Sequence, residues 1–235
     1  MQFYQHVRRR VIDRVMTFEP IGLMLFAALA GGLGLFLALT GEVVEGETHA
    51  FDERILLSLR TPGDLSVPIG PSWLNHAVGD ITALGGTTVL TLMTVLATIY
   101  LLLSRQRAIA AFMFLSIAGG WVVSSSLKIF VARARPEIVP HLVEVHDLSF
   151  PSGHAMLSAV TYLTLAALLS RAEPYRSSRI FLIFTGILLT MMIGMSRIYL
   201  GVHFPTDVLG GWCAGATWAA ACWMLARRYI SARPA

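Results

Sequence analysis

Long apolar stretches separated by short polar segments run along the whole chain. Four of these stretches have the roughly 20 residues that an α-helix needs to cross the hydrocarbon core of a bilayer: 21–39, 81–103, 108–127 and 208–226. Two more, 155–169 and 180–195, are shorter and can span only if their helices continue into the polar residues at one end. The pattern predicts an all-α, polytopic membrane protein with six transmembrane helices.

Basic residues predict the orientation of these spans, because Lys and Arg are enriched in cytoplasmic connections. Twelve of the 18 basic residues fall on one side, together with both termini. They are Arg8, Arg9, Arg10, Arg14, Arg105, Arg107, Arg171, Arg176, Arg179, Arg227, Arg228 and Arg233. The connection 41–80 carries seven acidic residues against two arginines and is expected outside.

The outer connection contains one further helical pattern. Apolar residues recur at helical spacing at Phe51, Ile55, Leu56 and Leu59, which predicts a short amphipathic helix over 51–59 on the outer face. Two interpretations stay open, a lid that packs on the helix bundle and a gate for substrate. Pro62, Pro68 and Pro71 then interrupt the chain before the second span.

Composition excludes a soluble domain. Hydrophobic residues make up 55% of the chain, charged residues 14%, and the mean hydropathy is +0.67, whereas soluble domains average about 25% charged residues. The net charge of +4 does not indicate a nucleic-acid partner, because the basic residues lie between apolar runs rather than on one face. No linker marks a second domain, so residues 1–235 are expected to form one unit. The first stretch is too long for a cleavable signal peptide.

Three groups of polar residues stand at span ends, where ionisable side chains are costly and therefore point to function. The first is Lys128, the only lysine of the chain, followed by Arg135-Pro136. If the helix continued, Lys128 and Arg135 would share one face, two turns apart, although Pro136 favours a turn there. Snorkelling to the interface explains Arg133 more easily than it explains the deeper Lys128.

The second group is Pro151-Ser152-Gly153-His154, at the start of the fourth span. Backbone amides at a helix N-terminus form a ready anion site, to which Ser152 adds a hydroxyl group and His154 an imidazole.

The third group lies between the fifth and sixth spans and comprises Ser196, Arg197, His203 and Asp207. The Asp207 carboxylate is within reach of His203 and can hold its imidazole in one tautomer. The guanidinium of Arg197 matches two phosphate oxygens.

Counting spans brings all three groups to the outer membrane face. Together they supply three cations, a helix N-terminus, two histidines and one carboxylate, which are the parts that phosphoryl transfer needs. A single candidate acidic ligand does not favour a two-metal site.

The three motifs read K-x6-R-P at 128–136, P-S-G-H at 151–154 and S-R-x5-H-x3-D at 196–207. Together they resemble the three-part signature of the type 2 phosphatidic acid phosphatase family, the lipid phosphate phosphatases. The resemblance covers about residues 80–225, includes the six-helix arrangement, and no signature position departs from the pattern. It implies a membrane enzyme that removes phosphate from a lipid without a metal or another cofactor.

The resemblance also implies a role for each motif residue. His203 would attack phosphorus and form a phosphohistidine, with Asp207 raising its basicity. His154 would protonate the leaving group and then activate water. The phosphate oxygens would be held by Lys128, Arg135 and Arg197, with Ser152, Ser196 and the Gly153 amide.

Several alternatives remain beside this interpretation. A lipid or phosphate transporter would favour ionisable groups near the bilayer midplane, and a six-span serine protease would have no use for three cations. The vanadium haloperoxidases are similar in signature but soluble. Undecaprenyl pyrophosphate, phosphatidylglycerophosphate, phosphatidic acid and lipid A all suit the site as substrates. A bacterial inner membrane, with cytoplasmic termini and a periplasmic site, is expected, whereas the oligomeric state is left open.

Overall fold

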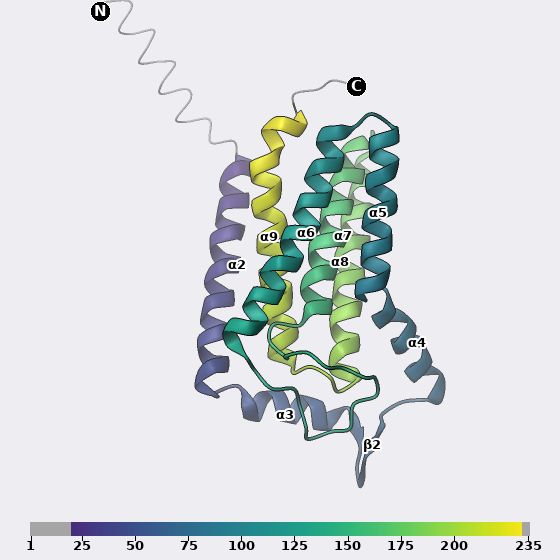
Figure 1. Cartoon of the computed structure of the whole chain (residues 1–235). Helices are drawn as coiled ribbons and strands as arrows, with labels where there is room; N and C mark the ends of the chain where they lie inside the picture. The colour runs from purple at the N-terminus through teal and green to yellow at the C-terminus, as the bar shows by residue number, and fades with distance from the viewer. Residues whose placement is uncertain (1–19, 232–235) are drawn as a thin grey trace, which may run out of the picture.

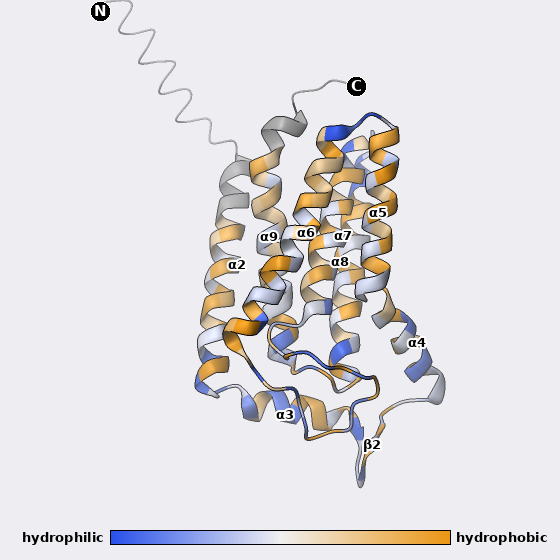
Figure 2. Ribbon diagram, in the orientation of Figure 1, coloured by the Kyte–Doolittle hydropathy of each residue, from blue (hydrophilic) through white to orange (hydrophobic). Residues whose placement is uncertain are grey.

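The computed structural model describes residues 20–231, which form a bundle of long helices closed at one end by shorter elements (Figure 1). The long helices are α2 (Pro20–Glu45), α5 (Thr87–Leu103), α6 (Arg107–Val131), α7 (Gly153–Ala172), α8 (Arg176–Tyr199) and α9 (Pro205–Ser231). Apolar residues cover their shafts, and hydrophilic residues gather at both ends of the bundle (Figure 2). The all-α membrane fold predicted from the hydrophobic pattern is confirmed.

The number of spans depends on how two bent helix pairs are counted. Within residues 20–231, α6, α7, α8 and α9 are each long and apolar enough to cross a membrane. Two more spans follow if α2 with α3 (His49–Ser58), bent by 91°, and α4 (Ser72–Ala83) with α5, bent by 44°, count as one each. The structure therefore accommodates the predicted six.

The two short apolar stretches do extend into polar residues, as spanning requires. Helix α7 starts at Gly153 and so takes in His154, while α8 continues to Tyr199 and takes in Ser196 and Arg197. These polar residues occupy the helix ends on the side where α3 lies. The turn between α5 and α6 and that between α7 and α8 lie at the opposite end, where α2 begins and α9 ends (Figure 1).

The second span differs from its prediction as one helix over 81–103. It is broken between Ala83 and Thr87, and α4 and α5 meet at an angle there. A Cβ at Gly85 would lie 2.3 Å from Cγ2 of Ile193 on α8. The backbone at the break thus packs directly on the bundle, which only a glycine permits.

Helix α7 lies at the centre of the bundle and is the most buried of its membrane helices. It packs closely against α9, where a Cβ at Gly211 would be 2.7 Å from the Ser152 carbonyl oxygen and one at Gly215 would be 2.5 Å from that of Met156. Small residues that let two helix backbones approach are typical of membrane interfaces. These two glycines serve packing within the chain.

The predicted amphipathic helix is confirmed as α3, which lies across the end of the bundle (Figure 1). Its Leu56 is fully buried in a cluster with Ala155, Ile198, Phe204 and Val208. The pattern misjudged the buried face in one respect, because Phe51 is half exposed while Asp52 is fully buried.

A short antiparallel hairpin follows α3 and was not predicted. It is formed by β1 (Arg60–Thr61) and β2 (Asp64–Pro68), with Thr61 paired to Asp64. Arg8, Arg9, Arg10, Arg14 and Arg233, which contribute to the predicted orientation, lie outside the described residues.

Candidate active site

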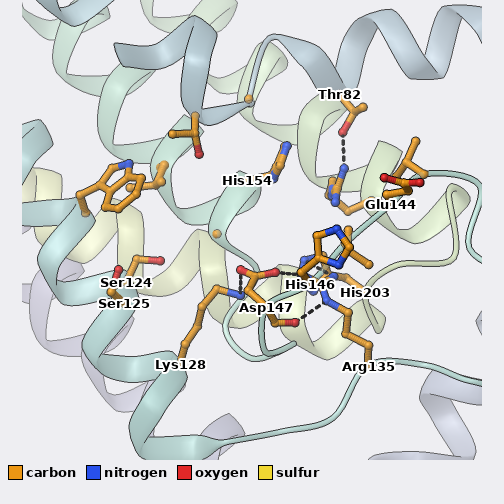
Figure 3. Close-up of a pocket in the computed structure, with 18 residues that line it drawn as sticks. Thr82, Ser124, Ser125, Lys128, Arg135, Glu144, His146, Asp147, His154 and His203 are labelled. Atoms are coloured by element: carbon orange, nitrogen blue, oxygen red, sulfur yellow. Dashed lines mark hydrogen bonds and ion pairs between the residues drawn. The ribbon is translucent and has the colours of Figure 1, made fainter.

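A cavity of about 420 Å³ opens at the end of the bundle where α3 lies. Its wall includes the ends of α4, α6 and α8, the starts of α5 and α7, and the connection between α6 and α7. Six of the nine predicted site residues line it: Lys128, Arg135, Gly153, His154, Arg197 and His203. Residues from all three sequence motifs therefore meet in one cavity (Figure 3).

Lys128 and Arg135 reach the cavity from different kinds of backbone. Helix α6 ends at Val131 and Ala132 is left-handed with φ of 51°, so the chain leaves the helix well before Pro136. The helix thus does not continue to Arg135, and the shared helix face considered for Lys128 and Arg135 does not form. Arg135 comes from an irregular segment, and its Nη1 donates to the Val202 carbonyl at 2.5 Å.

An unpredicted carboxylate bridges these two cations. Oδ2 of Asp147 lies 2.9 Å from Nζ of Lys128, and Oδ1 pairs with Nη2 of Arg135 (Figure 3). Partial burial alone would raise the pKa of Asp147, but its hydrogen bonds and ion pairs with Lys128 and Arg135 outweigh this effect and lower the pKa to about 2. Asp147 is therefore ionised at neutral pH.

Arg197 approaches from the last turn of α8. Its Nη1 donates to Oγ1 of Thr82 on α4 at 2.9 Å, while its buried Nε finds no partner among the described residues. His154, in the first turn of α7, lines the same cavity. Its ring lies beside the α4–α5 break, because a Cβ at Gly85 would stand 3.4 Å from its Cδ2.

His203 lies between α8 and α9, and its surroundings define its tautomer. Nη1 of Arg135 is 3.1 Å from Nε2, and since a guanidinium can only donate, Nε2 must accept. The proton then belongs on Nδ1, which is 3.4 Å from Oδ2 of Asp207. Burial, with the nearby cations of Arg135 and Arg197, lowers the pKa of His203 well below 6.5. The imidazole is neutral, and its Nε2 lone pair points to the cavity, where it accepts from Arg135.

Asp207 lies behind His203, outside the cavity lining, and is fully buried. Its Oδ2 accepts hydrogen bonds from Oγ of Ser149 at 2.5 Å and from the Phe204 amide at 2.9 Å. Its Oδ1 lies 2.7 Å from Nη1 of Arg133. The carboxylate is thus held on both oxygens.

The two predicted serines are not brought into the cavity. Oγ of Ser196 donates to the Ile193 carbonyl of its own helix at 2.6 Å. Ser152 is fully buried, its amide donates to the Asp207 carbonyl at 2.9 Å, and its Oγ has no hydrogen-bond partner among the described residues. Gly153 does line the cavity, where a Cβ would lie 3.5 Å from Cε of Lys128.

Sequence reasoning missed three residues of this site: Arg133, Asp147 and Ser149. Arg133 was interpreted as a cation that snorkels to the interface, but its side chain is only 9% exposed and pairs with Asp52 and Asp207. The unusual density of charge in Arg133, Arg135 and Asp147 was the available signal. No helical periodicity orients the side chains of Arg133, Asp147 and Ser149, because these residues lie in the irregular connection between α6 and α7.

Comparisons with known proteins agree on one family. Residues 109–230 match the sequence model of the PAP2 superfamily. The chain is 32% identical over 200 residues to phosphatidylglycerophosphatase B of Bacillus subtilis (strain 168), covering 84% of this chain and 90% of that protein. It is 31% identical over 121 residues to undecaprenyl-diphosphatase of Sulfolobus acidocaldarius, covering 49% of this chain and 54% of that protein.

Solved structures agree with these matches. A transmembrane PAP2-type phosphatidylglycerolphosphate phosphatase from Bacillus subtilis superposes with a TM-score of 0.75 at 27% identity, covering 86% of this chain and 96% of that one. Aquifex aeolicus LpxE gives a TM-score of 0.51 at 30% identity, covering 68% of this chain and 88% of that one.

The membrane-helix fold and these matches define an integral membrane phosphatase. The chain belongs to the PAP2 superfamily. The family resemblance inferred from the three motifs is confirmed.

Proposed function

We propose that the chain hydrolyses a phosphate or diphosphate group from a membrane lipid through a phosphohistidine on His203. One observation carries the proposal. Nε2 of His203 is unprotonated and lies at the cavity beside Arg135, while Nδ1 is directed at Asp207. A neutral imidazole oriented by a buried carboxylate has the arrangement of an activated nucleophile.

In the first step, Nε2 of His203 attacks phosphorus and the bond to the leaving oxygen breaks. His154 donates a proton to that oxygen, so the product leaves as a lipid alcohol or, from a diphosphate, as a singly protonated lipid phosphate. Lys128, Arg135 and Arg197 stabilise the charge on the equatorial oxygens. Asp207 stabilises the positive charge that develops on His203.

In the second step, His154 takes a proton from water, and the resulting hydroxide attacks the phosphohistidine. The P–N bond breaks, its electron pair returns to Nε2, and inorganic phosphate leaves. Because His154 gives a proton in the first step and takes one in the second, it ends the cycle in its starting state.

The shape of the cavity supports a lipid substrate. From the cations near Lys128 it continues along α6 past Ser125 and Ser124 to Trp121, a residue that is 44% exposed on the apolar surface of the bundle. A polar headgroup can therefore bind at the cations while its apolar chains remain in the bilayer. The two relatives described above are named for phosphatidylglycerophosphate and undecaprenyl diphosphate. Phosphatidylglycerophosphate is the first candidate, because its phosphatase matches over most of both chains.

We also propose that the cavity faces the periplasm of a bacterial inner membrane. Arg105 and Arg107 flank the α5–α6 turn, and Arg171 and Arg176 the α7–α8 turn, at the end of the bundle away from the cavity. Basic residues at that end support a cytoplasmic location for it.

Phosphate release from purified protein in detergent tests the function. Phosphatidylglycerophosphate, undecaprenyl diphosphate, phosphatidic acid and lipid A are compared with water-soluble glycerol phosphate. We expect release from at least one lipid, competitive inhibition by orthovanadate, and a loss on the order of 10⁴-fold in kcat for His203→Ala. The control is His76→Ala, which removes an exposed imidazole on α4 that does not line the cavity.

Each part of the proposal has its own contrary result. Activity on glycerol phosphate alone would refute the lipid substrate, and near-normal turnover by folded His203→Ala protein would refute the nucleophile. Lipid binding with no phosphate release by the wild type would favour a carrier or binding protein.

A further inference from the structure

Arg133 joins three separate elements at the back of the active site. It lies just beyond α6, and its Nη1 donates to Oδ1 of Asp207 at 2.7 Å and to Oγ1 of Thr206 at 2.8 Å. Its Nη2 donates to Oδ2 of Asp52 at 2.8 Å. The guanidinium carbon also stands 4.2 Å from the centroid of the Phe204 ring. One buried arginine thus contacts α3, the start of α9 and the loop that carries His203.

Asp52 completes this arrangement from α3. It is fully buried, and its Oδ1 accepts from the Thr206 amide at 3.0 Å, while its Oδ2 accepts from Oγ1 of Thr206 at 2.6 Å. A buried carboxylate is stable only when its charge is paired and its oxygens are hydrogen-bonded. Asp52 meets both conditions, which fixes α3 to the first turn of α9. Such an anchor favours the interpretation of α3 as a packed lid over that of a moving gate.

The contact with Arg133 determines how Asp207 faces the histidine. Arg133 binds Oδ1 of Asp207, which leaves Oδ2 for Nδ1 of His203. Ser149 and the Phe204 amide also donate to Oδ2 and so hold the carboxylate in this orientation. Pairing with Arg133 further favours the anionic form of this fully buried carboxylate, the form that stabilises a charged histidine. Neither Arg133 nor Asp52 lines the cavity, so neither reaches a bound phosphate directly.

We propose that Arg133 and Asp52 are positioning residues that orient the Asp207 carboxylate toward His203, with α3 as a fixed brace. This inference rests on the proposed function of His203 and Asp207. Arg133 and Asp52 act on the chemical step through Asp207. They are separate from the cations of the cavity that bind phosphate. Loss of Arg133 or Asp52 must therefore lower kcat while phosphate binding persists.

The test compares Arg133→Gln, Arg133→Lys and Asp52→Asn with wild type in detergent, using the lipid that the panel identifies. We expect Arg133→Gln to lower kcat by about 10- to 100-fold, as is typical when the partner of a catalytic group is removed. KM and the affinity for orthovanadate should change less than threefold. Arg133→Lys, which restores the charge but cannot bridge both carboxylates, should recover part of the loss. Arg54→Gln removes an exposed arginine from α3 and serves as the matched control.

A double-mutant cycle separates positioning from general destabilisation. Once Asp207→Asn has removed the carboxylate, the further change Arg133→Gln should cost less than threefold, because residues in one network are not additive. Losses that multiply would overturn the proposal, as would a parallel loss of orthovanadate affinity. If Arg133→Gln does not fold, Arg133→Lys and Asp52→Asn carry the same cycle.

The cycle also distinguishes failure of this inference from failure of the proposed function. Full activity of Asp207→Asn or His203→Ala would contradict the proposed function. Impaired activity of both, with normal kcat for folded Arg133→Gln and Asp52→Asn, would contradict the positioning role alone.

Discussion

Asp147 lies where a substrate phosphate would be expected to bind, between Lys128 and Arg135. Two cations that face one cavity repel each other, and a carboxylate between them compensates their charge. A phosphate that binds the same cations must compete with Asp147. Since the pKa of Asp147 is about 2, this competition persists through the physiological pH range and would weaken only as the pH falls toward that value.

At this residue, the change Asp147→Asn is expected to strengthen inhibition by orthovanadate or inorganic phosphate. The inhibition constant should fall by up to about fivefold, since ion pairs with a largely exposed partner contribute about 0.2–1 kcal/mol, and the Asp147 side chain is 61% exposed. The measurement is the inhibition constant in the phosphate-release assay. Glu137→Gln, which neutralises an exposed carboxylate of the same connection outside the cavity lining, is the control. Weaker inhibition of Asp147→Asn would mean that Asp147 holds the cations in place for the phosphate.

At the scale of elements, the close packing of α7 and α9 supports the site. The first turn of α7 carries Gly153 and His154, and the first turn of α9 carries Asp207. The packing of α7 against α9 therefore fixes these site residues relative to one another. That contact depends on Gly211 and Gly215, which lie directly against the α7 backbone. Any side chain at these positions must push the helices apart.

Gly215→Ala is therefore expected to destabilise the protein by about 1–3 kcal/mol, as overpacking does, despite the better helix propensity of alanine. The added Cβ would stand 2.5 Å from the Met156 carbonyl oxygen and 2.8 Å from Cβ of Ala159. Thermal unfolding in detergent measures the change. Gly34→Ala on α2, where a Cβ meets nothing within 4 Å, is the matched control and should be neutral or stabilising. Equal melting temperatures for the two variants would show that the helix pair can relax.

At the scale of the whole molecule, the bundle has two chemically different ends. The end away from the cavity carries the arginine-flanked turns. The cavity end carries α3 and the hairpin, which belong to the acidic connection 41–80 (Figure 2). By the positive-inside rule, this asymmetry predicts that the arginine-rich end lies in the cytoplasm.

Cysteine labelling in a bacterial inner membrane tests that orientation. In a background with Cys213→Ser and Cys222→Ser, a cysteine replaces either Asp64 in the exposed hairpin or Gln106 in the exposed α5–α6 turn. A membrane-impermeant maleimide added to spheroplasts should label Asp64→Cys at once. Gln106→Cys should react only after the membrane is opened. The reverse pattern would place the cavity on the cytoplasmic side.

Much of this fold could be predicted from hydrophobic length and motif order. The apolar runs predicted the membrane helices. Because successive helices alternate in direction, the end of α6, the start of α7 and the end of α8, which carry the motifs, were expected at one face. The break at Gly85 was missed because the apolar residues on both sides resemble one continuous span, although the pair Gly85-Gly86 is typical of a turn. The backbone there packs close to Ile193, more than 100 residues away in the chain, and only the tertiary structure shows this contact.

For the site, the sequence by itself determined the chemical class, because the motifs K-x6-R-P, P-S-G-H and S-R-x5-H-x3-D occur together and in order at the ends of spans. Only the tertiary structure decided which side chains meet. Ser196 turns back to its own helix, whereas Arg133, taken from sequence as a surface cation, lies buried between Asp52 and Asp207. The physical reason is that α6 ends at the left-handed Ala132. Beyond that residue no periodicity orients the side chains, and packing against α3 and α9 sets their directions.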